Sequence, residues 1–128
     1  MSDARFELIT AGIAAFNEGD LDRFADMFAV DAEVQRAGAF GTLQGREAIR
    51  AWVEPDAVEF RGITVTALER SGDQVLATCD LRIRGVGSGA EIANTTYLLL
   101  TFGDDLVRRM AIYFEKSEAL AAAMPAAN

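Results

Sequence analysis

The chain has no histidine and only one cysteine, Cys79. Histidine and cysteine supply most nucleophile–base pairs and most zinc ligands in proteins, so their scarcity excludes the commonest sites of covalent catalysis and of transition-metal binding. One cysteine also excludes an internal disulfide. The acidic residues Asp20, Asp22 and Asp26 lack a glycine-centred calcium loop, and helix capping with a solvated helix face explains them. The sequence therefore predicts no metal and no cofactor.

Basic residues are also few, and long apolar runs are missing. Twelve Lys and Arg stand against twenty Asp and Glu, which gives a net charge of −8 and no basic patch for a phosphate backbone. No run approaches the roughly 18 to 20 apolar residues of a membrane span, and the amino terminus lacks the basic and apolar regions of a signal peptide. We expect a cytoplasmic protein that contacts neither nucleic acid nor membrane.

What the chain does contain is enough apolar material for one core. It has 128 residues, of which 51% are hydrophobic, with eight Phe and only two Pro. A chain of this length buries roughly two-thirds of its unfolded surface on folding. We therefore expect residues 1–128 to form a single domain.

Helical spacing dominates the first half of the chain. Apolar residues recur every three or four positions over Asp3–Phe16, and Gly19 followed by Asp20 supplies a helix terminator and then a new N-cap. Leu21, Phe24 and Phe28 place the second helix there, with its exit at Asp31. A strand over residues 32–37, a glycine-rich loop over 38–45 and a third helix over 46–53 follow.

From Phe60 onward the apolar period changes from 3.6 to 2. The predicted strands are Phe60–Arg70, Gln74–Arg84, Ala90–Phe102 and Leu106–Phe114, followed by a short helix over Ser117–Met124. Short turns between successive strands predict antiparallel hairpins. The order of elements predicts an α+β fold, with three N-terminal helices packed on one face of a curved antiparallel sheet.

Alternation along the strands indicates which side chains face the helices. On the strand over residues 74–84 the apolar set contains Cys79, and on the strand over residues 32–37 Val34 and Arg36 share one face. A three-residue turn over 71–73 would place Ile63 and Val65 on the inner face, and a two-residue turn would reverse this choice. The last two strands carry large apolar groups on both faces. We expect the outer face, with Met110, to form a homodimer interface.

Three segments carry a family resemblance: FNEGDLD at residues 16–22, MFAVDAEV at 27–34 and GREAI at 45–49. Together with the order of elements, they resemble the NTF2-like superfamily, and its SnoaL-like and ketosteroid-isomerase-like branch in particular. The resemblance covers nearly the whole chain. It implies a cone in which three helices close over a bent sheet, a deep apolar pocket, and dimerisation through the outer sheet face.

The resemblance also implies where catalytic residues would stand. Ketosteroid isomerases place a tyrosine, an aspartate base and a protonated aspartate at the positions of Gly12, Arg36 and Thr96, and none of these groups is retained. The histidines of polyketide cyclases and scytalone dehydratases are also absent. The nearest match to the Asp-Arg-Asp set of limonene epoxide hydrolases is Asp80 with Arg82, on the polar face of its strand.

Arg36 is the main candidate for function. An inward arginine is costly unless its charge is compensated, either by a structural ion pair or by an anionic or carbonyl-bearing ligand. Arg36 and Asn94 are the catalytic candidates because they could polarise an oxygen. Trp52 fits the core better than a ligand wall, and Cys79 fits a small apolar wall residue. The predicted ligand-binding set is Arg36, Trp52, Cys79, Asn94, Thr96, Arg109 and Tyr113.

Together these observations predict a small-molecule-binding protein with an apolar pocket. One hypothesis is an enzyme of the isomerase, cyclase or hydrolase type that acts on a polyketide-, terpenoid- or steroid-like compound, by analogy of fold. The alternative is a non-catalytic binding module or a dimeric assembly module.

Overall fold

The computed structural model describes residues 3–36, 41–53, 58–85 and 91–123, with backbone alone for residues 58–61, 84–85 and 91–92. The predicted loop residues 38–40 and 86–89 lie outside these ranges. Along the chain the elements are α1 (Ala4–Glu18), α2 (Leu21–Ala25), β1 (Phe28–Gln35), β2 (Thr42–Gln44), α3 (Arg46–Trp52), β3 (Val58–Ser71), β4 (Gln74–Gly85), β5 (Glu91–Gly103), β6 (Leu106–Tyr113) and α4 (Lys116–Ala123).

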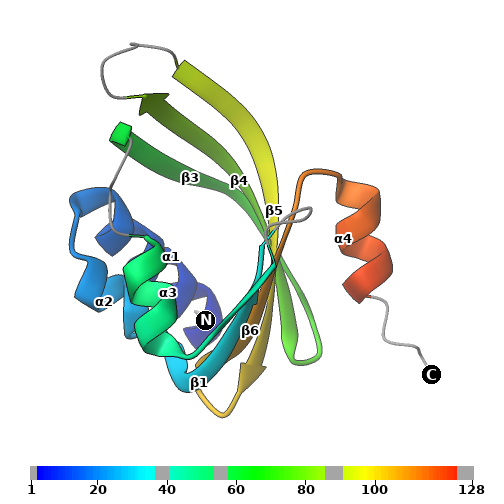
Figure 1. The fold of residues 1–128 in the computed structure, drawn as a ribbon. Helices are drawn as coiled ribbons and strands as arrows, with labels where there is room; N and C mark the ends of the chain where they lie inside the picture. Colours follow the sequence, from blue (N-terminus) through cyan, green and yellow to red (C-terminus); the bar gives the residue numbers. More distant parts are fainter. Residues whose placement is uncertain (1–2, 37–40, 54–57, 86–90, 124–128) are drawn as a thin grey trace.

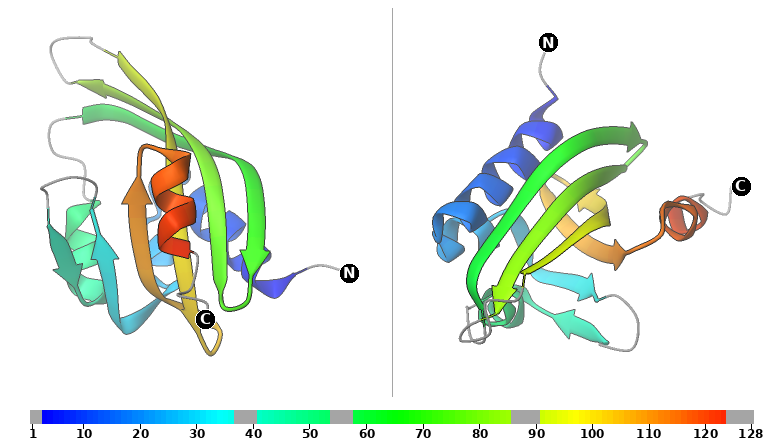
Figure 2. Two further views of the ribbon diagram at one scale, coloured as in Figure 1. Left: turned by 90° about the vertical axis from the view of Figure 1, so that its right-hand side faces the viewer. Right: turned by 90° about the horizontal axis from the view of Figure 1, so that it is seen from above.

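The fold is α+β, with one curved sheet between two unequal helical layers. The strand order is β2-β1-β6-β5-β4-β3. Helices α1, α2 and α3 lie on the concave side of the sheet, and α4 lies on the opposite, convex side (Figures 1 and 2). Strands β3 to β6 form the predicted antiparallel meander, whereas β1 pairs in parallel with β6, so the sheet is mixed. Within the described residues, no helix is long and apolar enough to span a membrane.

The helix signals at the N-terminal end are confirmed. Gly19 ends α1 with φ +83°, and the Asp20 carboxylate accepts a hydrogen bond of 3.3 Å from the Arg23 amide, as an N-cap does. The predicted length of the second helix is wrong, because α2 ends at Ala25 and β1 already begins at Phe28. The spacing of Phe28 fits both a helix and a strand. It belongs to a strand because it pairs with Val107 of β6.

The segment predicted as a loop over residues 38–45 contains a short strand, β2. It pairs with β1 through Val34 opposite Leu43. The following helix α3 is fixed to β1 by Arg46, whose Nε and Nη2 donate to the Phe28 carbonyl oxygen over 2.9 and 2.6 Å. This contact sets the position of Trp52 at the C-terminal end of α3.

The hairpin between β3 and β4 combines two features that alternation alone does not resolve. Ser71 pairs with Gln74, so the turn has two residues, and Gly72 adopts φ +61°. An extra residue in β3, Thr66, then shifts the register. Because of this bulge, Ile63 and Val65 face inward despite the two-residue turn.

A second bulge determines the faces of β6. Thr101 pairs with Arg109 but Phe102 pairs with Val107, so Arg108 is the extra residue. Its side chain packs on Gly103, where a Cβ atom would collide with it. Val107 and Met110 therefore both point into the core, and the expected placement of Met110 on the outer face is wrong. Met110 is 3% exposed and belongs to the inner core.

Helix α4 covers the centre of the convex face. Alternation from the inner residues places Leu76, Leu99 and Ala111 on this face, and they are register partners across β4, β5 and β6. All three are buried, as is Ala119 of α4. The apolar centre of the outer face is thus covered within the chain itself.

Candidate functional site

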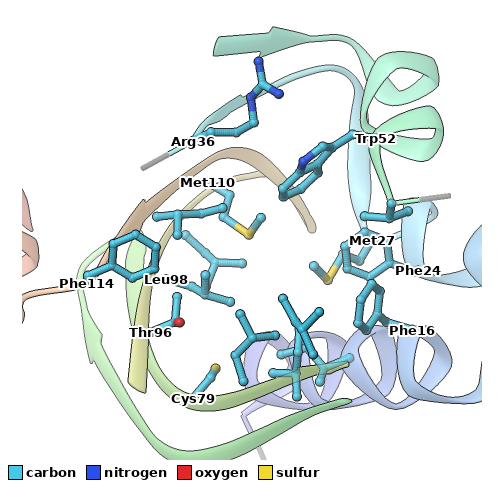
Figure 3. Close-up of a pocket in the computed structure, with 17 residues that line it drawn as sticks. Phe16, Phe24, Met27, Arg36, Trp52, Cys79, Thr96, Leu98, Met110 and Phe114 are labelled. Carbon is cyan, nitrogen blue, oxygen red and sulfur yellow. The ribbon is translucent and has the colours of Figure 1, made fainter. Parts of the chain in front are cut away.

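A pocket of about 390 Å³ lies between helices α1–α3 and the concave face of the sheet (Figure 3). It exists because the sheet bends away from the helices and the side chains between them do not fill the space. Seventeen residues line it: Ile13, Phe16, Phe24, Met27, Arg36, Trp52, Val53, Ile63, Cys79, Leu81, Ile83, Thr96, Leu98, Leu100, Met110, Ile112 and Phe114.

The exposure of the wall residues increases from the closed end of the pocket to its open end. Met27, Leu100 and Met110 are buried, whereas Ile83 is half-buried and Phe114 is 55% exposed. Figure 3 shows the sulfur atoms of Met27 and Met110 directed toward the centre of the hollow. Thioether side chains adapt their shape readily, so this part of the wall can adjust to an occupant.

Thr96 is the one buried polar side chain of the described core. It is 6% exposed, and its Oγ1 is buried without a hydrogen-bond partner in the described residues. A buried hydroxyl left in this state costs about 1–3 kcal/mol. Leu98 and Leu100 share its face of β5 and also line the pocket, so Thr96 is part of the pocket wall, with its hydroxyl oxygen covered by neighbouring atoms (Figure 3).

Cys79 lies directly across from Thr96 in the pairing of β4 with β5. It is a free thiol, buried at 1% exposure, and it lines the same wall. Burial, and to a lesser degree the charge of the neighbouring Asp80, raises the pKa of the Cys79 thiol to about 11. The thiol is therefore neutral at physiological pH and is a poor nucleophile.

Arg36 follows β1 at the rim of the pocket. Its amide donates to the Gly41 carbonyl oxygen over 2.9 Å, which extends the β1–β2 pairing by one step. In Figure 3 its stem lies on the wall near Trp52, while the guanidinium points away from the centre of the hollow. Arg36 thus shares the face of buried Val34, as alternation predicts, with its charge at the edge of the pocket.

The structure brings together four of the seven predicted ligand-binding residues. Arg36, Trp52, Cys79 and Thr96 line the pocket. Trp52 is half-buried and packs against the core while it forms part of the wall. Trp52 is therefore both a core residue and a wall residue, whereas the sequence favoured the core.

The other three residues do not line the pocket. Asn94 shares the face of Thr96 on β5 and pairs with the wall residue Leu81, but its side chain is exposed. The bulge at Arg108 turns Arg109 and Tyr113 to the convex face, so their expected inward orientation is wrong. There Arg109 donates to the Gln35 side chain over 2.6 Å and forms an ion pair with Glu33 at 3.6 Å.

Sequence reasoning missed most of the apolar wall, including Met27, Ile112 and Phe114. Ile112 and Phe114 share the face of Met110, and the register of β6 with β5 would have identified them. Met27 closes the pocket against α1, where a Cβ on Gly12 would lie 2.6 Å from its sulfur. A larger side chain at Gly12 would therefore require the Met27 side chain to move.

Asn17 fixes one wall of the pocket to the helical layer. Its side-chain amide donates to the Ile63 carbonyl oxygen and accepts from the Ile63 amide, both over 2.8 Å. This pair of hydrogen bonds joins the end of α1 to β3, which is an edge strand. Ile63 is a wall residue, so Asn17 helps to determine the width of the hollow.

The chemistry available at the wall is limited. Among the lining residues the structure describes, no carboxylate or histidine is present, and the only charge is that of Arg36. In the same part of the chain, no group of three or more potential metal ligands comes together. Asp80 and Arg82 are exposed and face away from the pocket. The wall thus offers shape and apolar contact, with the charge of Arg36 at its rim.

Comparison with known proteins identifies the family. Residues 9–110 match the family model of the SnoaL-like domain. The chain belongs to the SnoaL-like domain family. No curated protein matches the sequence.

Solved structures show that this SnoaL-like domain has the NTF2-like fold, as the sequence predicted. A hypothetical protein with a ketosteroid isomerase-like fold from Catenulispora acidiphila, in complex with trimethylamine, is 25% identical with a TM-score of 0.78, and 90% of each chain is covered. An NTF2-like protein of unknown function from Burkholderia pseudomallei is 15% identical with a TM-score of 0.80, covering 94% of this chain and 97% of that one. An LEH-like epoxide hydrolase from M. tuberculosis is 12% identical with a TM-score of 0.76, covering 92% and 87%.

Proposed function

We propose that this SnoaL-like domain binds a small apolar organic molecule, of polyketide-, terpenoid- or steroid-like character, in the pocket under α1–α3. The observation that supports the proposal is the hollow of about 390 Å³ inside an otherwise buried core. Protein interiors are normally close-packed, and a hollow of this size forfeits contacts that a filled core would gain. A retained apolar hollow is therefore characteristic of a ligand site.

The chemistry of the wall supports binding in preference to acid–base turnover. General acid–base catalysis needs a group that exchanges a proton near neutral pH, within hydrogen-bond reach of the substrate. The described wall offers the Arg36 guanidinium, which is a hydrogen-bond donor without an acceptor atom, and the Cys79 thiol, whose pKa is raised to about 11. The relative from Catenulispora acidiphila, solved with trimethylamine, supports a small-molecule ligand for this fold.

A pair of neighbouring substitutions tests the pocket directly. Leu81 lines the hollow and is half-buried, whereas Arg82 is exposed on the other face of β4. Leu81→Trp should fill part of the hollow and weaken binding of decalin or a decalone by about tenfold, equivalent to ~1.4 kcal/mol. The matched control Arg82→Trp should leave binding unchanged. Thermal shift and calorimetric titration measure both.

Two outcomes of this experiment contradict the proposal. If the wild-type chain binds none of these apolar probes, or if Leu81→Trp binds them as the wild type does, the pocket is not the ligand site. Recovery of the probe by mass spectrometry after incubation tests catalysis separately. We expect the probe unchanged, and a converted probe would favour an enzyme of the isomerase, cyclase or hydrolase type.

Homodimerisation through the outer sheet face stays a prediction. Met110, which was expected on that face, lies in the inner core, and α4 covers the part of the outer face that carries Leu99 and Ala111. Light scattering on the purified protein tests it, because a particle of 13.8 kDa is a single chain and contradicts the prediction.

A further inference from the structure

Met27 lies between α2 and β1, where its backbone is held from both sides. Its amide donates a hydrogen bond to the Phe24 carbonyl oxygen over 3.3 Å, and its carbonyl oxygen accepts one from the Val107 amide of β6 over 2.9 Å. The side chain is 2% exposed and lines the closed end of the pocket, with its sulfur directed toward the hollow (Figure 3). Because the backbone is fixed, the position of the thioether depends on its own torsion angles and on what packs behind it.

Behind Met27 lies Gly12, a buried residue of α1. A Cβ atom added at Gly12 would lie 2.6 Å from the Met27 sulfur, but 3.4 and 3.5 Å from Cγ and Cβ of the same side chain. The severe collision is therefore with the sulfur. Glycine inside a helix is unfavourable relative to alanine, so this close approach is a physical reason for a glycine here. The missing side chain at Gly12 gives the Met27 sulfur room at the margin of the hollow.

We propose that Met27 and Gly12 set the depth of the pocket, and that the pocket takes compact hydrocarbon skeletons of about two fused rings in preference to the four-ring skeleton of a steroid. This inference rests on the proposed function, since it names the size class of the ligand. Both residues determine specificity in this proposal. Met27 ends the hollow at α1, and Gly12 allows the thioether to lie back far enough for two rings to fit.

The size of the hollow supports a compact ligand. At about 390 Å³ it is near the lower end of the roughly 300–1,000 Å³ that small-molecule sites enclose. Met27 and Met110 are buried at its closed end, and Phe114, which is 55% exposed, lies at its open end. Rings beyond those that fill the hollow would extend past Phe114 into water, where their apolar surface stays unburied. Affinity should therefore stop rising once the hollow is filled.

The side chain of Met27 has one direction in which it can move. Gly12 lies behind it, and the buried ring of Phe24 lies beside it (Figure 3). Close-packed interiors leave little free volume on such sides, whereas the hollow is unfilled volume that the thioether already borders. A side chain added at position 12 should therefore push the thioether into the hollow and shorten it. Truncation of Met27 should lengthen the hollow toward α1.

Two saturated probes, decalin with two fused rings and perhydrophenanthrene with three, separate this inference from the proposed function. Binding of decalin to the wild type reports the apolar pocket alone. We expect the wild type to bind perhydrophenanthrene no more than about threefold tighter than decalin, although the third ring adds apolar surface. Met27→Ala should bind perhydrophenanthrene about tenfold tighter than decalin, because the third ring fills the space that the thioether leaves. Met27→Leu conserves volume and should keep the wild-type ratio, which makes it the matched control. Calorimetric titration measures both affinities for each variant.

The opposite change is made at Gly12. Gly12→Ala adds a Cβ atom that collides with the movable end of Met27, so the chain should fold and should bind decalin about tenfold more weakly than the wild type. The double variant Gly12→Ala/Met27→Val lacks the colliding sulfur and should restore decalin binding to within about threefold of the wild type. Recovery by a second substitution distinguishes a shortened hollow from a damaged fold. Circular dichroism and the urea midpoint check that each variant folds.

Each departure from these results contradicts the depth limit. Perhydrophenanthrene binding about tenfold tighter than decalin in the wild type, an unchanged ratio in folded Met27→Ala, or wild-type decalin binding in Gly12→Ala would overturn the inference and leave the proposed function standing. A Gly12→Ala chain that fails to fold would overturn it too, because the thioether would then have no space to enter. If Met27→Ala does not fold, the two Gly12 variants decide. Failure of the wild type to bind decalin and perhydrophenanthrene alike would overturn both proposals.

Discussion

The concave and convex faces of the sheet are both covered by helices, but the two coverings differ in tightness. On the convex side, the alanine-rich α4 contacts β4, β5 and β6, and Leu76, Leu99 and Ala111 are buried on that face. On the concave side, α1–α3 meet a sheet that curves away from them, and a hollow remains. Both faces bury apolar side chains, so hydrophobicity alone does not distinguish a packed interface from a binding site. The separation between helices and sheet distinguishes them, because the curvature of the sheet leaves a hollow only on the concave side.

We expect the packing of α4 on the convex face to be more sensitive to a buried charge than the packing of α1–α3 on the concave face. Ala119 of α4 is fully buried against the sheet. Ala119→Asp would place a carboxylate where it has no partner, and we expect a loss of about 2–4 kcal/mol in the free energy of unfolding. Urea denaturation measures this loss. Ala122→Asp, at an exposed position of the same helix, is the control and should change stability by less than ~0.5 kcal/mol. Equal effects would mean that α4 does not dock on the sheet.

Two adjacent leucines of β5 compare the faces directly. Leu99 is 2% exposed under α4, whereas Leu98 is 8% exposed and borders the hollow. Leu99→Ala should cost about 3 kcal/mol, because it removes a fully packed side chain and leaves a cavity. Leu98→Ala should cost about 1.5 kcal/mol, since part of its surface already lacks contacts. Urea unfolding of both variants measures the difference. If Leu98→Ala cost as much as Leu99→Ala, the concave face would be packed in solution and the hollow would not exist.

The same comparison shows what the sequence could predict. The helix signals around Gly19 and Asp20, and the alternation of β4, depend on local residue types, and they were sufficient for the fold class and for placing Cys79 and Thr96 on the wall. The faces of β6 were not predictable in this way. One extra residue at Arg108 reverses the alternation, and both faces of this strand carry apolar groups because α4 covers the outer one. Local pattern therefore gave no signal that would turn Met110 inward and Tyr113 outward.

The hydrogen bonds that join α1 to β3 should contribute less to the free energy of unfolding than these packed side chains do. Asn17 makes two hydrogen bonds of 2.8 Å with the backbone of Ile63. Asn17→Ala should lower the free energy of unfolding by about 1–1.5 kcal/mol, because the contact is solvent-exposed and water replaces part of it. It should also weaken binding of decalin, since the wall at Ile63 is released. Thr95→Ala, at an exposed position on the outer face of β5, is the control. Unchanged stability in Asn17→Ala would mean that the link does not hold β3 to α1.

The smallest effect concerns pH, and it compares the inner face at Cys79 with the outer face at Asp80. The pKa of the Cys79 thiol is raised from 9.0 to about 11, first by burial and second by the charge of Asp80. The unfolded chain therefore loses this proton at lower pH than the folded chain. The stability that the neutral thiol contributes is fully present below about pH 9 and is lost as the pH rises toward 11. Urea unfolding between pH 7 and pH 10.5 should show a steeper alkaline loss in the wild type than in Cys79→Ala. Asp80→Asn should retain most of this difference, because burial is the larger cause. If Asp80→Asn removed it, the carboxylate on the outer face, not the apolar wall, would control the thiol.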